Sequence, residues 1–436
     1  MSDTHSELGQ RTLRKVAWRL IPFMGLLYFL AFVDRVNIGF AALTMNADLG
    51  LTPSMFGFAS GIFFIGYVLF EVPSNIVMER VGARLWIARI MITWGLLSAS
   101  TAFVSSPNNL YVLRFLLGVA EAGFFPGMIL YLTYWFPAAS RGRIVGAFMM
   151  ALPISTVIGS PVSTAMLSLN AFGLHGWQLM FLAEGIPALL CGFVVLGVLR
   201  DGPARAAWLT DEERNWLSSE LAAERAALGP VSHSSLAGLR EPRVWFLGLV
   251  YFGMLVGTYG VGFWLPQIVK RLGNLSNFEV GLTTALPYAI AAATMYLWGR
   301  HSDRTRERTW HVALAAFVGA LGLALSAYWS DMPVLAFAAL CLSVMGSYSA
   351  LPVFWTLPTS MFAGSAAAAC IALVNSIGNN GGFFGPTLVG FVTDATGSFT
   401  AALWTLAAFV AAAGILVLAL APRTRALVAT SETQPP

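Results

Sequence analysis

Two pairs of opposite charges interrupt long apolar stretches of this sequence. Arg114 and Glu121 fall within the apolar run 110–134, and Asp34 and Arg35 stand near the end of the first apolar run, in YFLAFVDRVNIGF. A charged side chain at membrane depth is costly unless it faces protein, water or a partner. Two arginines and two carboxylates so placed predict a buried site for a small anion and for protons. A structural ion pair is the alternative for each pair.

The spacing of these charges restricts how they can act together. Arg114 and Glu121 are seven residues apart, which is two helical turns, so they share one helix face about 10 Å apart along the axis. Asp34 and Arg35 are neighbours in sequence and point about 100° apart, so both cannot line the same patch of wall. An arginine offers a planar fork that fits a carboxylate and stays charged, whereas Glu121 can titrate.

Uncharged polar and aromatic residues in other apolar runs are further candidates. Asn375 and Asn379 share a helix face and suit substrate hydroxyls or carboxylates, although packing at a tight helix crossing is the competing explanation. Glu71 and Glu184 are flanked by apolar residues, and packing through hydrogen bonds to loop arginines or helix termini is favoured over proton coupling. The aromatic candidates for a cavity wall are Tyr28, Tyr67, Tyr259, Trp264 and Trp355.

The composition indicates an integral membrane protein. The chain of 436 residues is 57% hydrophobic and 11% charged, against about 25% charged residues in soluble proteins. Its apolar runs have the length of spanning helices rather than of barrel strands. The three cysteines lie inside apolar segments without a CxxC pattern, and the five histidines lie in tails, loops or helix ends. We therefore expect no disulfide framework, metal or cofactor, and the net charge of +4 does not indicate nucleic-acid binding.

The fold predicted from these runs is an all-α membrane protein with twelve transmembrane helices in two six-helix halves. Of the 25 Lys and Arg residues, only Lys270 and Arg271 fall on one side of the membrane once Arg35 and Arg114 are set aside as intramembrane. This bias predicts that both termini are cytoplasmic. The expected spans are 20–38, 55–77, 86–105, 110–134, 142–168, 177–199, 244–269, 279–299, 310–329, 333–357, 365–393 and 399–421.

The predicted organisation places one long polar connection between the halves. In it, Thr210 and Glu213 form a capping box that should begin a short helix reaching about Leu228. The loops NIVMERVGARLWIAR and WGRHSDRTRERTWH occupy equivalent positions and indicate weak internal symmetry. The expected segments are a cytoplasmic tail 1–19, an N-terminal half 20–199, a cytoplasmic linker 200–243 with an amphipathic helix, a C-terminal half 244–421 and a cytoplasmic tail 422–436.

Several motifs together resemble a known family. Twelve spans in a 6+6 arrangement, with acid- and Arg-rich loops after spans two and eight, look like the major facilitator superfamily. Within it, VDRVNIGFA, EVPSNIVMERVGAR, RFLLGVAEAGFFPG, YLTYWFP and NSIGNNGGFFGP are similar to the anion:cation symporter family. The phrases GRHSDRTRER and FWTLPTS are similar to bacterial tartrate-type and hydroxyphenylacetate-type permeases, and galactonate permeases are more distant relatives.

The resemblance implies a secondary active transporter rather than an enzyme, in a bacterial inner membrane. It implies proton-coupled uptake of a small organic carboxylate, such as tartrate, a sugar acid or a hydroxyaromatic acid, by a monomer whose partners are the substrate, protons and the lipid bilayer. The alternative is a proton-independent uniporter or an exporter of neutral or aromatic compounds. The implied proton-coupling residues are Asp34 and Glu121. The residues expected to bind substrate are Arg35, Arg114, Tyr28, Tyr67, Asn375, Asn379, Tyr259 and Trp355. The residues expected to act in gating are Glu79, Arg80, Arg84, Asp303 and Arg304.

Overall fold

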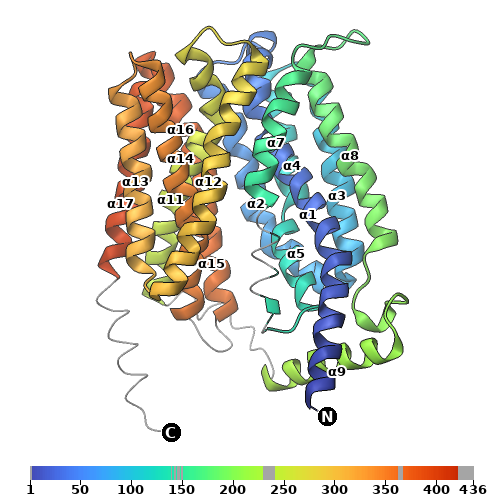
Figure 1. Ribbon diagram of the computed structural model, residues 1–436. Helices are drawn as coiled ribbons and strands as arrows, with labels where there is room; N and C mark the ends of the chain where they lie inside the picture. The colour runs from blue at the N-terminus through green and yellow to red at the C-terminus, as the bar shows by residue number, and fades with distance from the viewer. Residues whose placement is uncertain are drawn as a thin grey trace.

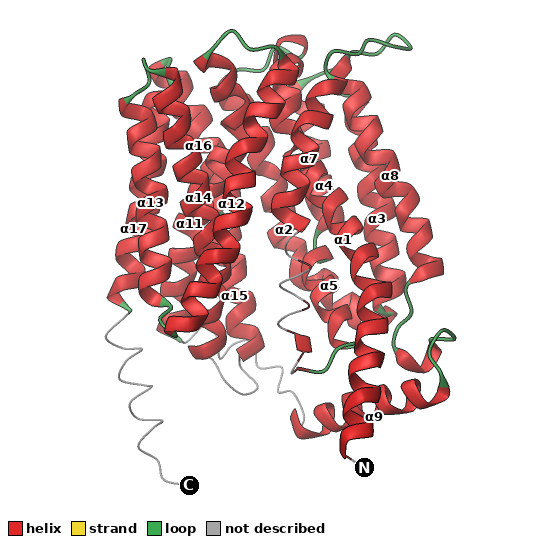
Figure 2. Ribbon diagram, viewed as in Figure 1, coloured by secondary structure: helices red, strands yellow, loops and turns green. Residues whose placement is uncertain are grey.

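Most of the described structure consists of apolar helices. The computed structural model describes residues 2–138, 140, 141, 144, 148, 151–228, 241–361 and 367–420. Within these residues the only pairing of β type is an isolated bridge between Ala171 and Leu174, and Figure 2 shows helices joined by short loops. In the described part of the chain, ten helical segments are long and apolar enough to cross a membrane. They match ten of the twelve predicted spans.

The other two predicted spans are shorter or interrupted in the described residues. The predicted span 142–168 contains α7 (Ala151–Met166), and the predicted span 365–393 contains α15 (Ala367–Asn379) and α16 (Gly381–Thr396). Part of each predicted range lies outside the described residues.

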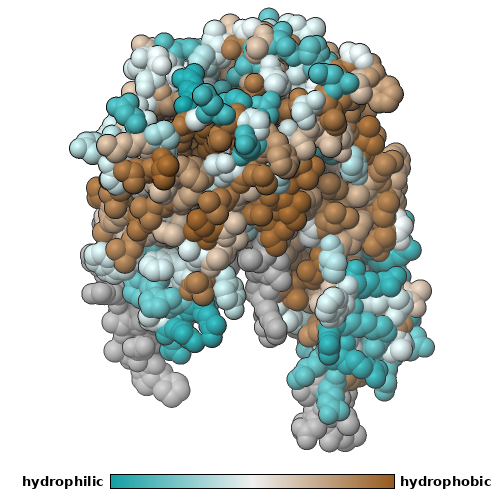
Figure 3. Space-filling model, turned by 45° about the horizontal axis from the view of Figure 1, so that its top comes forward, coloured by the Kyte–Doolittle hydropathy of each residue, from teal (hydrophilic) through white to brown (hydrophobic). Residues whose placement is uncertain are grey.

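Two groups of helices stand side by side in Figure 1. The first group consists of α1 (Ser2–Asp48), α2 (Pro53–Val81), α3 (Ala83–Ser100), α4 (Pro107–Glu121), α5 (Phe124–Thr133), α7 and α8 (Gly176–Val198). The second group consists of α11 (Pro242–Leu272), α12 (Asn277–Thr305), α13 (Thr309–Tyr328), α14 (Pro333–Met361), α15, α16 and α17 (Phe399–Ala419). Figure 3 shows an apolar belt across both groups, with polar residues above and below it.

Small residues allow the helices within each group to approach closely. Gly95 of α3 lies against the backbone of Leu189 in α8, and Gly185 of α8 lies against the backbone of Ala99. A side chain at either glycine would push the two helices apart, because the nearest atoms are backbone atoms that cannot rotate away. Close approach through small residues is the usual basis of helix packing in lipid, where van der Waals contact replaces the hydrophobic effect.

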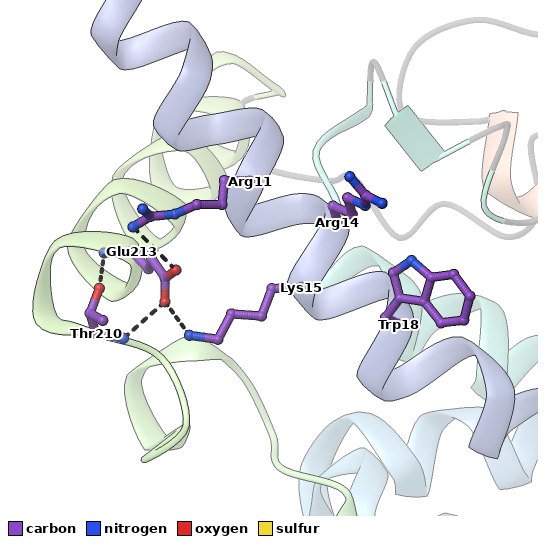
Figure 4. A pocket seen from close by; sticks show the side chains of 6 residues that line it. All are labelled: Arg11, Arg14, Lys15, Trp18, Thr210 and Glu213. Carbon is purple, nitrogen blue, oxygen red and sulfur yellow. Dashed lines mark hydrogen bonds and ion pairs between the residues drawn. The ribbon is translucent and has the colours of Figure 1, made fainter.

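The N-terminal residues are helical. Helix α1 begins at Ser2, so residues 2–19 are continuous with the first span, and their basic residues meet the linker helix α9 (Asp211–Leu228). Figure 4 shows Glu213 of α9 facing Lys15 and Arg11, with Oε2 of Glu213 2.7 Å from Lys15 Nζ. The predicted capping box is present, because the Thr210 hydroxyl accepts from Glu213 N at 3.2 Å and Glu213 Oε2 accepts from Thr210 N at 3.0 Å.

Among the described residues, the two groups touch most extensively where α2 meets α16, α7 meets α12 and α1 meets α11, and α2 also meets α15. We call the end of the bundle that carries the N-terminus the N-terminal face, and the opposite end the far face. Close contacts lie at the far face, where Ser54 N donates to Asp394 Oδ2 at 2.8 Å and Gly57 lies against the Pro386 carbonyl. Trp264 packs between Phe56 and Phe399 in the same region, with ring centroids 4.9 and 5.3 Å away. These residues close the far-face end of the boundary between the groups.

Candidate substrate and proton site

An ion pair between α1 and α4 forms the centre of the candidate site. Nη2 of Arg35 donates to Oε1 of Glu121, and the Arg35 side chain is 13% exposed whereas Glu121 is fully buried. The guanidinium also lies over the rings of Phe63 and Tyr67, 5.5 and 5.3 Å from their centroids. Nε of Arg35 and Oε2 of Glu121 have no hydrogen-bond partner among the described residues. The pair therefore retains unused hydrogen-bonding capacity.

Arg114 is a buried cation on the same helix as Glu121, seven residues earlier. Its guanidinium lies 5.1 Å from the centroid of Phe63, and its Nε donates to the Ala59 carbonyl at 3.4 Å. The side chain is 1% exposed, and Nη1 and Nη2 have no hydrogen-bond partner in the described part of the chain. Phe63 thus contacts two guanidinium groups from different helices. An anion entering here would supply the acceptors that Arg114 lacks.

Asp34 points into the first helix group, away from its neighbour Arg35. Trp94 Nε1 and the Ser98 hydroxyl of α3 donate to its carboxylate, as does Asn37 Nδ2 at 3.0 Å. The carboxyl is 1% exposed. The expected divergence of Asp34 and Arg35 is therefore observed. The partners on α3 were missed, since nothing local in the sequence links them to Asp34.

A break in the fourth predicted span positions Glu121. Glu121 is the last residue of α4, and Gly123 adopts φ 85° before α5 begins at Phe124. Ser74 of α2 stabilises the break, because its hydroxyl donates to the Ala122 carbonyl at 2.6 Å. The run 110–134 is therefore two helices, and Glu121 lies where the chain changes direction.

Three of the predicted tyrosines surround the Arg35–Glu121 pair. Tyr67 contacts Arg35 directly, and Tyr28 interacts electrostatically with both Arg35 and Glu121 while its ring stacks on Phe148 at 4.7 Å. Tyr259 comes from α11 in the second group, and its electrostatic field also acts on Arg35. Its ring lies 4.5 Å from that of Phe64 in α2. Tyr259 therefore brings the second helix group to the site.

Asn375, predicted to bind substrate, reaches the first helix group through Glu71. Its Nδ2 donates to Oε1 of Glu71 at 2.8 Å, which joins α15 to α2. Asn379 is buried, and Asn380, which lies between α15 and α16, donates to the Ser376 carbonyl of α15. Among the described residues Glu71 bonds Asn375 rather than a loop arginine or a helix terminus, so the expected partner was wrong. Glu71 also interacts electrostatically with Arg35.

The expectation for Glu184 was wrong in the same way, because its partner is a side chain within the helices. The Ser163 hydroxyl of α7 donates to its Oε1 at 2.5 Å. Two aromatic candidates lie apart from Arg35. Trp355 packs against Tyr251 of α11, with centroids 5.0 Å apart, and Trp264 belongs to the far-face contact.

The predicted gating residues lie at the N-terminal face. Arg84 is tied to the end of α8, because its backbone N donates to Asp201 Oδ1 at 2.9 Å and its Nε donates to the Leu196 carbonyl at 2.8 Å. Asp303 pairs with Arg308 at 2.7 Å. Glu79, Arg80 and Arg304 are exposed. The two loops are thus held differently: the backbone of Arg84 meets an acid that follows α8, whereas Asp303 pairs with an arginine of its own loop.

A histidine pair at this face escaped the sequence reasoning. Nδ1 of His301 lies 2.7 Å from Nε2 of His311, whose Nδ1 lies 3.2 Å from Glu307. The ten-residue separation spans the end of α12 and the start of α13, so no helical spacing brings the two rings together. The pair lies at the N-terminal face, apart from the Arg35–Glu121 pair.

Comparison with known proteins identifies the family. The family model described as Major Facilitator Superfamily matches residues 24–386. The chain belongs to the major facilitator superfamily. The predicted membership and the all-α membrane fold are confirmed, and this superfamily member is a multi-pass membrane transporter.

Relatives and solved structures agree with this assignment. A protein of Agrobacterium vitis named "Putative tartrate transporter" is 53% identical over 417 residues, covering 95% of this chain and 92% of that protein. A protein of Acinetobacter baumannii named "Quinolone resistance transporter" is 40% identical over 396 residues, covering 90% and 91%. The inward-open xylose transporter XylE of E. coli superposes with a TM-score of 0.72 at 17% identity, covering 93% of this chain and 96% of that chain, and this likeness concerns the fold alone.

Proposed function

We propose that the protein is a proton-coupled symporter that takes up a small organic carboxylate by alternating access. The observation that carries the proposal is the set of charges around Phe63. Arg114 is buried with two guanidinium nitrogens that lack a partner among the described residues, and Arg35 is held by a carboxylate, Glu121, that can be neutralised. A carboxylate substrate fits both guanidiniums. A hydroxydicarboxylate such as tartrate, a sugar acid or a hydroxyaromatic acid meets this requirement.

Protonation of Glu121 would couple proton uptake to binding of the substrate anion. While Glu121 is ionised it neutralises Arg35, so an incoming anion must compete with it for the same guanidinium. Once Glu121 takes up a proton, its charge is lost and Arg35 becomes available to the substrate. Tyr28, Tyr67 and Tyr259 surround this exchange, and Asn375 and Asn379 come from the second half. Asp34 carries the second proton, separated from substrate by the wall of α1.

The two halves and the two faces of the bundle define how the transporter works across the membrane. The halves 20–199 and 244–421 rock against each other as a monomer, joined by the linker 200–243, with tails 1–19 and 422–436. The N-terminal face is cytoplasmic, which the positive charges there support. Glu79, Arg80, Arg84, Asp303 and Arg304 act at the cytoplasmic gate. The far face then opens to the outside of a bacterial inner membrane.

The test begins with a panel of carboxylates, tartrate included, ranked by the thermal shift of the purified protein. Uptake of the best compound is then measured in proteoliposomes with an imposed pH gradient. Asp34→Asn and Glu121→Gln should each abolish gradient-driven accumulation while exchange of internal for external substrate persists. Arg35→Ala should lose the thermal shift. Accumulation at the wild-type rate in both carboxyl variants would remove them from coupling.

The relative named for quinolone resistance favours a second candidate, an exporter of aromatic compounds that does not bind carboxylates through Arg35. The same panel separates the two candidates. An exporter of this kind should bind neutral aromatic compounds in the thermal-shift assay and tolerate Arg35→Ala. It should also show no stabilisation by aliphatic hydroxy acids.

A further inference from the structure

A hollow of about 550 Å³ lies at the N-terminal face, between the start of α1 and the linker helix α9. Its lining, drawn in Figure 4, consists of four α1 residues and two residues at the N-terminal end of α9, which are Arg11, Arg14, Lys15, Trp18, Thr210 and Glu213. Lys15 precedes Arg35 by 20 residues on one helix, which is about 30 Å. The hollow is therefore separate from the proposed transport site.

The side chains around the hollow carry more positive than negative charge. Arg11, Arg14 and Lys15 bring three positive charges, and Glu213 brings one negative charge. Glu213 is shared between Lys15 at 2.7 Å and Arg11 at 3.7 Å. Arg14 has neither a hydrogen bond nor an ion pair with another described residue. The hollow thus suits an anion, and the Arg14 guanidinium has its N–H donors available for one.

A tryptophan stands beside the unpaired arginine. Figure 4 shows the side chains of Arg14 and Trp18 extending away from Glu213, whereas those of Arg11 and Lys15 extend towards it. Arg14 and Trp18 are four residues apart, so they are neighbours on one face of α1. The Trp18 side chain is 73% exposed. Tryptophan so exposed suits the interface of a membrane, where its ring lies among the lipid headgroups.

The height of these two residues matches the headgroup layer. Trp18 and Arg14 precede Leu20, where the first predicted span begins, by two and six residues, or about 3 and 9 Å along the helix axis. The headgroup region extends about 5–7 Å beyond the hydrocarbon core on each side, and a long arginine side chain can reach back to it. Figure 3 shows that polar residues follow the apolar belt at this end of the bundle.

We propose that the hollow between α1 and α9 holds the phosphate of an anionic phospholipid from the leaflet at the N-terminal face. The Arg14 guanidinium binds the phosphate oxygens through paired N–H donors. The Thr210 hydroxyl accepts from Glu213 N at 3.2 Å and can donate its own hydrogen to the same phosphate. The Trp18 ring packs against the lipid beside its headgroup.

Two features of the hollow select this occupant. The excess positive charge disfavours a zwitterionic lipid, whose choline would bring a further cation to the same place. The Trp18 ring offers apolar surface that a lipid can cover and an inorganic phosphate ion cannot. The inference goes beyond the proposed function and does not depend on which substrate the protein transports.

The experiment measures lipid binding to the full-length protein in detergent by native mass spectrometry. The probes are phosphatidylglycerol and phosphatidylcholine with the same acyl chains, and phosphatidylglycerol should bind more tightly. Arg14→Gln should weaken phosphatidylglycerol binding about fivefold, as expected for one basic residue beside an anionic headgroup, and leave phosphatidylcholine binding unchanged. Arg300→Gln is the matched control, because Arg300 is exposed at the same face, near the end of α12, but lies outside the hollow. Its effect should stay within twofold.

A pair of tryptophans provides a second variant and its control at constant charge. Trp18→Ala should weaken phosphatidylglycerol binding more than twofold, whereas Trp310→Ala should not. Trp310 is 45% exposed at the start of α13 and does not line the hollow. Both side chains are exposed, so neither substitution should disturb folding, which thermal unfolding of the purified variants checks.

Three results would overturn the lipid site. Equal weakening by Arg14→Gln and Arg300→Gln would show only a general attraction of lipid to a positive face. Phosphatidylglycerol bound no more tightly than phosphatidylcholine would exclude selection of an anionic lipid. Inorganic phosphate should give no thermal shift, and a shift that Arg14→Gln removes would assign the hollow to free phosphate instead. None of these measurements involves transport, so each of these results leaves the proposed function standing.

Discussion

At the scale of single residues, the stability of a buried polar group depends on each of its hydrogen-bond partners. Glu71 is 4% exposed, and its Oε1 accepts from Asn375 while its Oε2 has no hydrogen-bond partner among the described residues. When a buried carboxyl accepts a single hydrogen bond, removal of that bond leaves the cost of its desolvation uncompensated. The bond also joins the two helix groups near Arg35.

Removing the amide of Asn375 should therefore destabilise the protein. Asn375→Leu leaves both oxygens of Glu71 without a partner, at a cost of about 1–3 kcal/mol, so thermal unfolding of the purified protein should begin at a lower temperature. Replacing both partners, as Asn375→Leu with Glu71→Met, should recover most of the loss. Asn380→Leu is the control, because among the described residues the Asn380 side chain bonds only carbonyls of α15, which does not join the two helix groups. An equal shift for the two single variants would contradict the prediction.

For single residues, the sequence predicted correctly that Asp34 and Arg35 point in different directions, but it did not predict which residues they contact. The turn angle of a helix separates Asp34 from Arg35, and Arg35 does meet a carboxylate. However, the sequence paired Glu121 with Arg114, the residue two turns away, whereas the direct ion pair is with Arg35 of another helix. Trp94 and Ser98 lie 60 and 64 residues from Asp34. Contacts at such separations depend on which helices pack together, and local spacing does not encode that.

At the scale of elements, the break between α4 and α5 decides where Glu121 lies. Gly123 adopts φ 85°, a conformation that is costly for residues with a Cβ atom. A Cβ there would also meet the side chain of Ser74, which stabilises the break. The run 110–134 was predicted as one span because its hydropathy is continuous across the break. The signal that was available is the Gly123–Pro126 spacing, since both residues are common at helix interruptions.

Gly123→Ala should lower both stability and transport. The left-handed backbone costs an alanine about 1–2 kcal/mol, and displacement of Ser74 would shift Glu121 relative to Arg35. Gly25→Ala is a matched control, because Gly25 lies within α1 with open space around it. An alanine there should stabilise the helix by up to about 1 kcal/mol. Thermal unfolding and uptake are measured for both, and a Gly123→Ala protein as stable as Gly25→Ala would count against the role of the break.

The docking of α9 on the N-terminal helix should depend on pH. Burial acts to raise the pKa of Glu213, but the hydrogen bond from Lys15, the Thr210 backbone and the charge of Arg11 outweigh it and hold that pKa below its usual value. A carboxyl with a lowered pKa stabilises the docked form above its usual pKa, and this stabilisation is lost as pH falls through the lowered value.

Hydrogen exchange of the α9 amides, followed from neutral pH to below the usual pKa of glutamate, should show protection lost on acidification. Glu213→Gln should remove the pH dependence and give weak protection throughout. Glu220→Gln, a change of the same type on the same helix, is the control. If hydrogen-exchange protection of the α9 amides in the wild-type protein does not change with pH, the ion pair is excluded as the docking contact.

At the scale of the whole molecule, the far-face contact should open in every transport cycle. It joins helices that lie far apart in sequence, through Ser54 with Asp394 and through Gly57 against Pro386. The division into six and six helices could be predicted from counting apolar runs. Which helices meet across the boundary could not, because α2 with α16 and α7 with α12 are pairings of surfaces rather than of sequence neighbours.

A disulfide across this contact should stop transport reversibly. In a variant with Cys191, Cys341 and Cys370 replaced by Ser, Ser54→Cys combined with Asp394→Cys should cross-link under mild oxidation. Uptake should fall to background and return on reduction, because alternating access requires these residues to separate. The two single cysteine variants are the controls, and each should transport with and without oxidant. Full uptake by the cross-linked protein would show that the contact does not open.

The charges around Phe63 have an electrical consequence. In their ordinary ionised forms, Arg35 and Arg114 together cancel Asp34 and Glu121, so the cluster as a whole is neutral. A membrane potential does work of about 2.3 kcal/mol per 100 mV on each net charge that crosses it, and a neutral cluster experiences none. The unloaded carrier should therefore reset at a rate that voltage does not alter. Any current would belong to the loaded half of the cycle, and its sign would report how many protons accompany each negative charge on the substrate.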